Sequence, residues 1–192
     1  MKSNLLVFDD FYTNVDSVRQ YALGLDFNIA GNYPGLRTLP EPTEQKEYLK
    51  SFFEESIINK KITHWPDEYN TSYQMTFKYD DTWVHHDDTE WAGILYLTPN
   101  APVASGTGIY RHKKSGIYEW NSNDPDTDFN GTEDLADTNA WDLIDQVGNI
   151  YNRLIVYRGS LYHRSVVPGF GSNKETGRLF QTFFFDTEGE NE

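Results

Sequence analysis

The chain has 192 residues and no cysteine, so disulfides and thiolate ligands are excluded and any metal must be held by histidine and carboxylate. Its net charge of −14, from 30 acidic and 16 basic residues, disfavours non-specific binding to nucleic acid, although a local basic groove stays compatible with it. Aromatic residues make up 16% of the chain while mean hydropathy is −0.68, which is typical of a β-rich fold with many turns.

The length predicts a single domain spanning residues 1–192. Within it we expect a helical support over residues 1–70, a β-rich core over residues 71–187 and an acidic tail over residues 188–192. The sequence shows neither an 18-residue apolar segment nor an apolar run behind a basic N-terminus. We therefore expect a soluble, cytoplasmic protein without a membrane partner, and the sequence leaves its oligomeric state open.

The first part of the chain reads as one strand and two helices. Residues 5–8 form an apolar run typical of a short strand, and Asn14 or Asp16 can cap a helix that ends near Gly24. Apolar residues then recur at three and four positions over residues 43–58, which predicts a second helix. We expect both helices to pack on the outside of the core.

From residue 71 onward the apolar period changes from helical to alternating, which predicts strands. These are expected over residues 73–79, 91–98, 106–112, 153–157, 161–167 and 178–186. The polar segment 113–138 is predicted to be a long loop over one end of the sheet, and long loops in small domains are often functional. Thr138 or Asn139 is predicted to cap a short helix that runs to Val147.

A cluster of imidazoles and carboxylates lies just before the strand at residues 91–98. It contains His85, His86, Asp87 and Asp88, and side chains two residues apart in an extended chain point to the same face. His85 with Asp87 and His86 with Asp88 are therefore both possible ligand pairs for a divalent metal. Spacing alone does not choose between them, and an exposed acidic turn explains the same residues.

A third metal ligand must come from elsewhere in the chain. His163, at a turn leading into a strand, is the best candidate, although it can also be an ordinary packed histidine. His64 precedes Trp65 and Pro66 at a helix end and reads as a surface residue, and His112 lies among cationic neighbours that oppose metal binding. Two histidines and one carboxylate are the set that non-haem Fe(II) oxygenases use.

A second chemical element is Arg178, which begins the most apolar strand of the chain. The arginine either caps the strand at the surface or reaches a buried anion, since guanidinium binds carboxylate through two parallel hydrogen bonds. Tyr79 and Tyr96 in neighbouring strands are candidates to share that task, or are core residues with a solvated hydroxyl. Arg37 either reaches a substrate groove or is a surface residue.

Residues 73–187 resemble the catalytic core of the Fe(II)/2-oxoglutarate-dependent dioxygenases, nearest to the prolyl 4-hydroxylase-like branch. That family carries His-x-Asp, a distal histidine and then a basic residue, an order matched here by His85, Asp87, His163 and Arg178. The flanking segments match as well, namely Trp83, the strand 94–98, the segment 152–157 and the final strand 178–186. Ser105-Gly106 departs from the family's glycine pair, and the 113–138 loop is longer than the core requires.

The resemblance implies an α+β, mainly β chain whose core is a double-stranded β-helix, a jelly roll of the cupin type. It implies the register in which His85, Asp87 and His163 hold Fe(II), with His86 and Asp88 as neighbours of the site. Arg178 would then bind the C5 carboxylate of 2-oxoglutarate, and Tyr96 and Tyr79 would line the cosubstrate pocket. The loop between Tyr79 and His85 is shorter than usual in the family.

The implied activity is hydroxylation that consumes O2 and 2-oxoglutarate and releases succinate and CO2, with ascorbate as a possible reductant. The branch resemblance implies a prolyl or other peptidyl substrate, and a small molecule is the other candidate. The alternative hypothesis is a cupin-like metal-binding or structural module without oxygenase turnover. A nucleic-acid demethylase of the same superfamily is a third hypothesis, which the negative charge disfavours.

Overall fold

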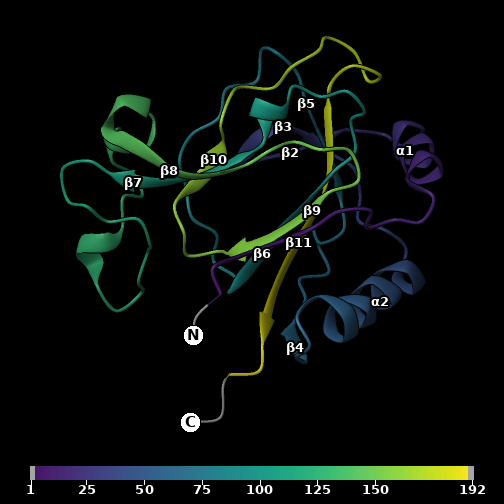
Figure 1. Cartoon of the computed structure of the whole chain (residues 1–192), viewed down its shortest axis with the longest axis horizontal. Coiled ribbons are helices and arrows are strands. Elements are labelled where there is room, and N and C mark those ends of the chain that lie inside the picture. The colour runs from purple at the N-terminus through teal and green to yellow at the C-terminus, as the bar shows by residue number, and fades with distance from the viewer. Residues whose placement is uncertain (1–2, 190–192) are drawn as a thin grey trace.

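Antiparallel β-sheets dominate the computed structural model, which describes residues 3–189 (Figure 1). In that part of the chain the larger sheet has the strand order β1-β9-β6-β11-β5-β3-β2, and β4 joins it by pairing with β11. A smaller sheet has the order β10-β7-β8. The prediction of a mainly β chain is confirmed. Residues 190–192 of the predicted acidic tail lie outside the described residues.

The strands and helices have the following bounds. The strands are β1 (Leu5–Phe8), β2 (Ile29–Gly31), β3 (Tyr33–Arg37), β4 (Ile62–His64), β5 (Tyr73–Thr76), β6 (Trp91–Tyr96), β7 (Thr107–His112), β8 (Trp141–Val147), β9 (Leu154–Arg158), β10 (His163–Ser165) and β11 (Arg178–Thr187). The helices are α1 (Val15–Leu23) and α2 (Thr43–Phe52), which a π-helical turn, η1 (Phe53–Ile57), continues. Single 3-10 turns are η2 (Val103–Ser105), η3 (Pro125–Thr127), η4 (Glu133–Leu135) and η5 (Thr138–Ala140).

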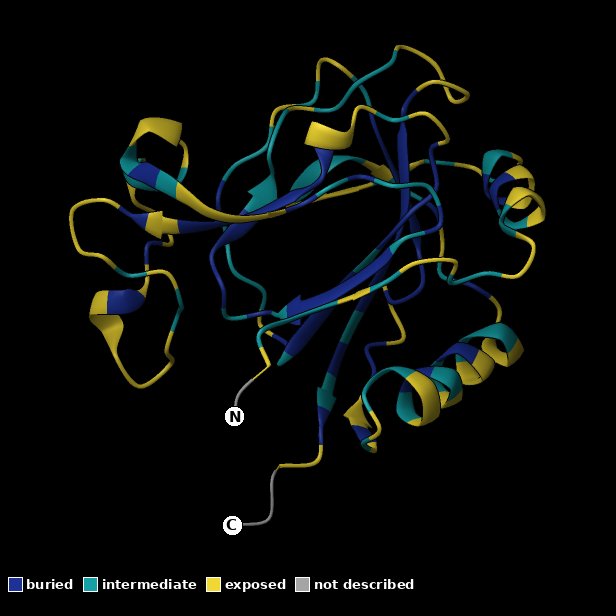
Figure 2. Cartoon of the chain, in the orientation of Figure 1, coloured by how far each residue is buried: buried dark blue, intermediate teal, exposed yellow. Residues whose placement is uncertain are grey.

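Strand β11 is the centre of the larger sheet. It pairs with β6 on one side and with β5 and then β4 on the other, so its backbone is hydrogen-bonded along both edges. Most of its side chains are buried, as expected for a strand covered on both faces. Figure 2 shows β6, β9 and β11 as a continuous buried layer.

Helices α1 and α2 lie on the same side of the molecule, away from β7 and β8 (Figure 1). Of the two caps that the sequence left open, Asn14 and Asp16, the structure has Asn14, whose side chain accepts a hydrogen bond from the Ser17 amide at 3.2 Å. An aromatic cluster joins the helical side to the sheet, with the Phe53 and Phe183 ring centroids 4.7 Å apart. Outer helix faces stay exposed, as Figure 2 shows.

The predicted helix from residue 138 to Val147 is wrong, because Trp141–Val147 forms strand β8. Trp141, Ile144 and Val147 are spaced by three, which mimics a helical face. The segment instead pairs along β7, from His112 opposite Trp141 to Thr107 opposite Val147, with a bulge between. Pairing with β7 therefore gives residues 141–147 a strand conformation despite their helical spacing.

Residues 1–70 contain strands β1 to β4 in addition to the two predicted helices. Strand β5 is shorter than predicted, because it ends at Thr76. The next residues turn sharply, with the Asp80 amide donating to the Phe77 carbonyl and the Phe77 amide to the Asp80 carboxylate. No helix within residues 3–189 is long and apolar enough to cross a membrane.

The 113–138 loop carries a small core of its own. Phe129 packs edge-on against Trp141 and Tyr162, and the Tyr162 hydroxyl donates to the Thr127 carbonyl at 2.7 Å. His112 lies 3.2 Å from the Asp134 carboxylate and ties the loop to β7. The loop and the β7–β8 pair lie at the left of Figure 1, on the side opposite the helices.

We predict that Phe183→Ala lowers the free energy of unfolding by about 3–5 kcal/mol, the usual cost of an aromatic-to-alanine cavity. Phe183 is fully buried between Phe53, Phe11 and Trp65. Denaturant unfolding of the purified variants measures the change. Tyr79→Ala is the control, since Tyr79 is 75% exposed, and a comparable loss in both variants would contradict the assignment of the core.

Candidate metal centre

Backbone pairing brings the two halves of the site together. The amide of His85 donates to the His163 carbonyl at 3.0 Å, and the amide of His163 donates back at 2.8 Å. Two residues further on, the Asp87 amide donates to the Gly159 carbonyl at 2.8 Å. A Cβ at Gly159 would lie 2.1 Å from the Thr89 carbonyl oxygen, so this close approach requires glycine.

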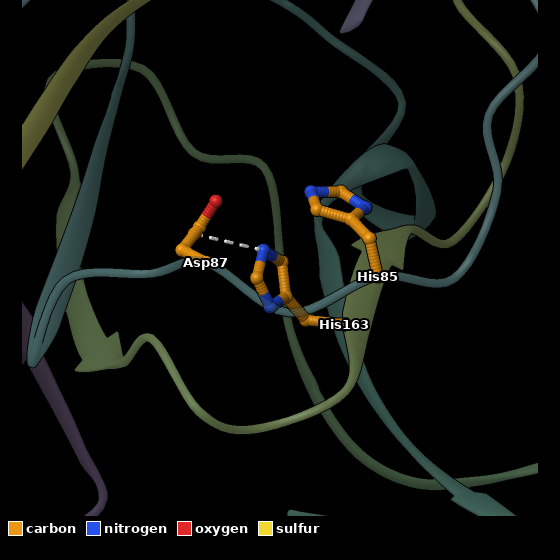
Figure 3. A group of neighbouring side chains, drawn as sticks. All are labelled: His85, Asp87 and His163. Atoms are coloured by element: carbon orange, nitrogen blue, oxygen red, sulfur yellow. Dashed lines mark ion pairs between the residues drawn. The ribbon is translucent and has the colours of Figure 1, made fainter. Parts of the chain in front are cut away.

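The side chains of His85, Asp87 and His163 converge on one point (Figure 3). Their candidate ligand atoms all lie within 4.8 Å of one another, and His163 Nε2 is 3.3 Å from Asp87 Oδ2. His85 Nδ1 lies 3.1 Å from the Trp83 carbonyl and His163 Nδ1 lies 2.7 Å from the Leu161 carbonyl. A carbonyl only accepts, so each Nδ1 carries the proton and each Nε2 is free to bind a metal.

The electrostatics suit ligands that bind a cation. Burial, with His163 nearby, lowers the pKa of His85 to about 4, so this imidazole is neutral at physiological pH. Burial by itself would raise the pKa of Asp87, but His163, His85 and Arg37 outweigh it and the pKa is lowered. Neutral imidazoles and an ionised carboxylate are the protonation states that divalent metal binding requires.

The other candidates from the sequence lie apart from this group. The His86 ring stacks on Trp120 with centroids 4.4 Å apart, and its Nε2 is 3.2 Å from the amide nitrogen of Asn130. Asp88 and His64 are exposed, and His112 is paired with Asp134. Of the two ligand pairs that spacing left open, the structure joins His85 and Asp87 to His163.

A cavity of about 720 Å³ opens on the three converging side chains. Arg178 lines it and is only 2% exposed. Its Nε donates to the Ser105 carbonyl at 3.3 Å, while its Nη2 is buried without a hydrogen-bond partner in the described part of the chain. Burial lowers the pKa of Arg178. An unpartnered buried donor on a cation is costly, so this position favours a bound anion.

The two predicted tyrosines lie in different places. Tyr96 is fully buried beside Arg178, whose guanidinium carbon is 5.7 Å from its ring, and it shares a 2.8 Å hydrogen bond with Thr107. The structure does not bring Tyr79 to the cavity. It lies on the surface next to Lys78, because β5 ends at Thr76 and the chain turns away before Tyr79.

Sequence reasoning missed Tyr157, which lines the cavity. Its ring centroid is 4.6 Å from that of His163, and burial raises its pKa well above the usual value. In the sequence Tyr157 ends an apolar run and reads as a core residue. Its position opposite Ala92 in β6 and beside His163 is what distinguishes Tyr157 from an ordinary core tyrosine, and only the structure shows it.

Arg37, whose place the sequence left open, also lines the cavity. Its Nε donates to the Gln74 side-chain oxygen at 2.8 Å, and its guanidinium lies 3.8 Å above the Tyr33 ring. It reaches the cavity from β3, whereas Arg178 reaches it from β11. Arg164 of β10 lines it as well, so arginines from three strands line one cavity.

Comparison with known proteins places this site in context. The model of a family of unknown function (DUF6445) matches residues 1–185, and a search of curated proteins finds no match. HygX from Streptomyces hygroscopicus with nickel and 2-oxoglutarate bound is similar in structure, with a TM-score of 0.57, 11% identity, and coverage of 95% of this chain and 82% of that one. HygX with nickel, 2-oxoglutarate and hygromycin B bound has a TM-score of 0.56 to this chain, at the same identity and coverage.

A further similar structure is the Fe(II)/(alpha)ketoglutarate-dependent dioxygenase TqaL, with a TM-score of 0.50, 10% identity, and coverage of 98% of this chain and 84% of that one. Identities this low show a common fold and nothing about shared chemistry.

We predict that Asp87→Ala and His163→Ala each weaken Ni(II) binding by at least about 100-fold, since even outer partners of metal ligands are worth roughly 10–100-fold. Isothermal titration of Ni(II) into each purified variant measures the affinity. His86→Ala and Asp88→Ala are matched controls from the same turn and keep the wild-type affinity. Loss of binding in the controls rather than in the first pair would contradict the assigned register.

Proposed function

The chain belongs to DUF6445, a family of unknown function, and we propose that it is an Fe(II)- and 2-oxoglutarate-dependent oxygenase that hydroxylates its substrate on a double-stranded β-helix core. One observation carries the proposal. His85, Asp87 and His163 converge at a cavity that also contains Arg178, a buried cation with an unpartnered donor. The structural likeness to HygX and TqaL supports it at the level of the fold.

The three converging residues fit Fe(II). Two imidazoles and a carboxylate would hold the ion from one side, which is the ligand set that leaves positions open for oxygen and a cosubstrate. Carbonyl partners at Trp83 and Leu161 fix both imidazoles in the orientation that presents Nε2. Bound iron supplies the oxygen chemistry that turns 2-oxoglutarate into succinate and CO2 and inserts a hydroxyl into the substrate.

Arg178 fits the far carboxylate of 2-oxoglutarate. Its Nη2 has no partner in the described residues, and the rest of the guanidinium is held by the Ser105 carbonyl and by packing 4.4 Å from the Phe180 ring. A carboxylate there would satisfy the donor and neutralise the buried charge. Tyr96 is not among the residues that line the cavity, and it packs beside Arg178 with its hydroxyl 2.8 Å from that of Thr107.

The remaining cavity wall gives room for a substrate beside the cosubstrate. Trp83 and His86 line it, as do Asn130 and Leu135 of the long loop. The 113–138 loop therefore contributes to the wall of the cavity. A prolyl or other peptidyl substrate stays a prediction from sequence, and the HygX structure contains a small molecule, hygromycin B.

We predict that the purified protein with Fe(II), ascorbate and 2-oxoglutarate consumes O2 and releases succinate without added substrate. His163→Ala loses this activity, because one iron ligand is gone. Arg178→Gln raises the KM for 2-oxoglutarate by about 10- to 100-fold, the value of hydrogen bonds between charged groups. Succinate release and O2 uptake are measured together.

Arg153→Gln is the control for loss of a positive charge, since Arg153 pairs with Asp9 away from the cavity. Its KM for 2-oxoglutarate stays at the wild-type value. Binding of metal and 2-oxoglutarate without any succinate would favour the alternative of a metal-binding module without turnover. Unchanged rates in both His163→Ala and Arg178→Gln would overturn the site.

A further inference from the structure

A second cationic position faces the same cavity, two strands away from Arg178. In the larger sheet Arg178 lies opposite Thr76, while Gln74 lies opposite Arg37 on the far edge of β5. Neighbouring strands are about 4.8 Å apart and residues rise about 3.4 Å each, so the two arginine Cα atoms are roughly 12 Å apart.

The guanidinium carbon of Arg178 lies 4.4 Å from the Phe180 ring, and that of Arg37 lies 5.6 Å from the Phe184 ring, four residues and roughly 13 Å further along β11. The two guanidinium groups therefore lie over different parts of β11, which suits a separate anion at each.

The guanidinium of Arg37 has hydrogen-bonding capacity to spare. Within residues 3–189 no carboxylate lies within salt-bridge distance of it, unlike Arg153 and Arg158, which pair with Asp9 and Glu90. Its Nε is used by Gln74, so both Nη groups remain available. This end-on pair of donors is one of the faces of arginine that can bind a carboxylate through two parallel hydrogen bonds.

Gln74 and Tyr33 hold the guanidinium in place. Gln74 is 2% exposed, accepts from Arg37 Nε at 2.8 Å and donates from its own amide to the Pro34 carbonyl at 2.7 Å. Tyr33 lies 3.8 Å from the guanidinium carbon and Phe184 lies 5.6 Å from it. An arginine fixed in this way loses little entropy on binding an anion.

The residues around Arg37 indicate the chemistry of the rest of the ligand. Tyr33, Pro34, Tyr69 and Phe184 line the cavity next to it, so an apolar or aromatic body can pack beside the charged group. Asp87 is near enough for its charge to raise the pKa of Arg37 against the lowering effect of burial. When a metal neutralises Asp87, the charge of Arg37 is left for a ligand.

We propose that Arg37 binds a carboxylate of the primary substrate, which is therefore a carboxylic acid with an apolar body. This carboxylate is distinct from that of 2-oxoglutarate at Arg178. The inference rests on the proposed function, because it assumes that metal and 2-oxoglutarate fill the other end of the cavity. It assigns the specificity of the site to β3, outside the segment that carries the proposed metal ligands.

The test is direct binding to the protein loaded with Ni(II) and 2-oxoglutarate, so that no turnover is needed. Benzoate, phenylacetate and 3-phenylpropionate are titrated by calorimetry, each beside its uncharged carboxamide. At least one acid is expected to bind saturably and about tenfold or more tighter than its amide. Arg37→Gln is expected to remove about tenfold or more of the acid's affinity and to leave the amide's unchanged. Arg37→Lys keeps the positive charge but loses the planar pair of donors, so its affinity for the acid should lie between those of the wild type and Arg37→Gln.

Two control variants separate a specific contact from general attraction. Arg111→Gln removes the same charge from an exposed position paired with Asp142, and acid affinity should stay within about twofold. Arg164→Gln tests the competing arginine of the same cavity, whose buried Nε also lacks a partner in the described residues, and the role assigned to Arg37 requires acid affinity to stay within about twofold. Thermal melting of each variant confirms that it is folded.

Several results would overturn the inference. These are equal binding of acids and amides, unchanged acid affinity in Arg37→Gln, transfer of the loss to Arg164→Gln, or no saturable binding of any acid. Failure of the proposed function is seen separately, as failure of Ni(II) or 2-oxoglutarate to bind in the preceding titrations. Binding of both without binding of acids contradicts only the role of Arg37.

Discussion

The reciprocal hydrogen bonds between the backbones of His85 and His163 are the constraint on which the site depends. They join a turn before β6 to the start of β10, segments far apart in the chain, and fix both imidazoles at once. Asp87 is positioned by the hydrogen bond from its amide to the Gly159 carbonyl, and only glycine fits at position 159. The candidate metal centre is thus specified by backbone geometry, which sets the positions of its three side chains.

Buried positive charge in a strongly acidic protein is the second organising feature. Several arginines of this chain pair with carboxylates, as Arg153 pairs with Asp9, whereas neither the buried Arg178 nor the half-buried Arg37 has a carboxylate within salt-bridge distance among residues 3–189. The buried Arg19 also lacks a carboxylate but donates to two backbone carbonyls, whereas Nη2 of Arg178 has no partner among the described residues. The same physical demand therefore supports an anionic cosubstrate at one end of the cavity and an acidic substrate at the other.

Sequence reasoning identified the residues that converge, because His85, Asp87, His163 and Arg178 lie in a family order with matching flanks. It could not place residues whose position depends on distant partners. Tyr79 leaves the site because the strand ends three residues early, and β8 is a strand only because β7 lies beside it. The role open to Arg37 appears only when Gln74 and Tyr33 are seen to hold its guanidinium.

A crystal structure of the protein with Fe(II) and 2-oxoglutarate, grown without oxygen, would show directly which residues hold the metal. We expect one metal ion at about 2.0–2.2 Å from Nε2 of His85, a carboxylate oxygen of Asp87 and Nε2 of His163. We also expect the far carboxylate of 2-oxoglutarate on the free Nη2 of Arg178. A metal bound through His86 and Asp88, or a 2-oxoglutarate molecule that leaves Arg178 unpartnered, would contradict it.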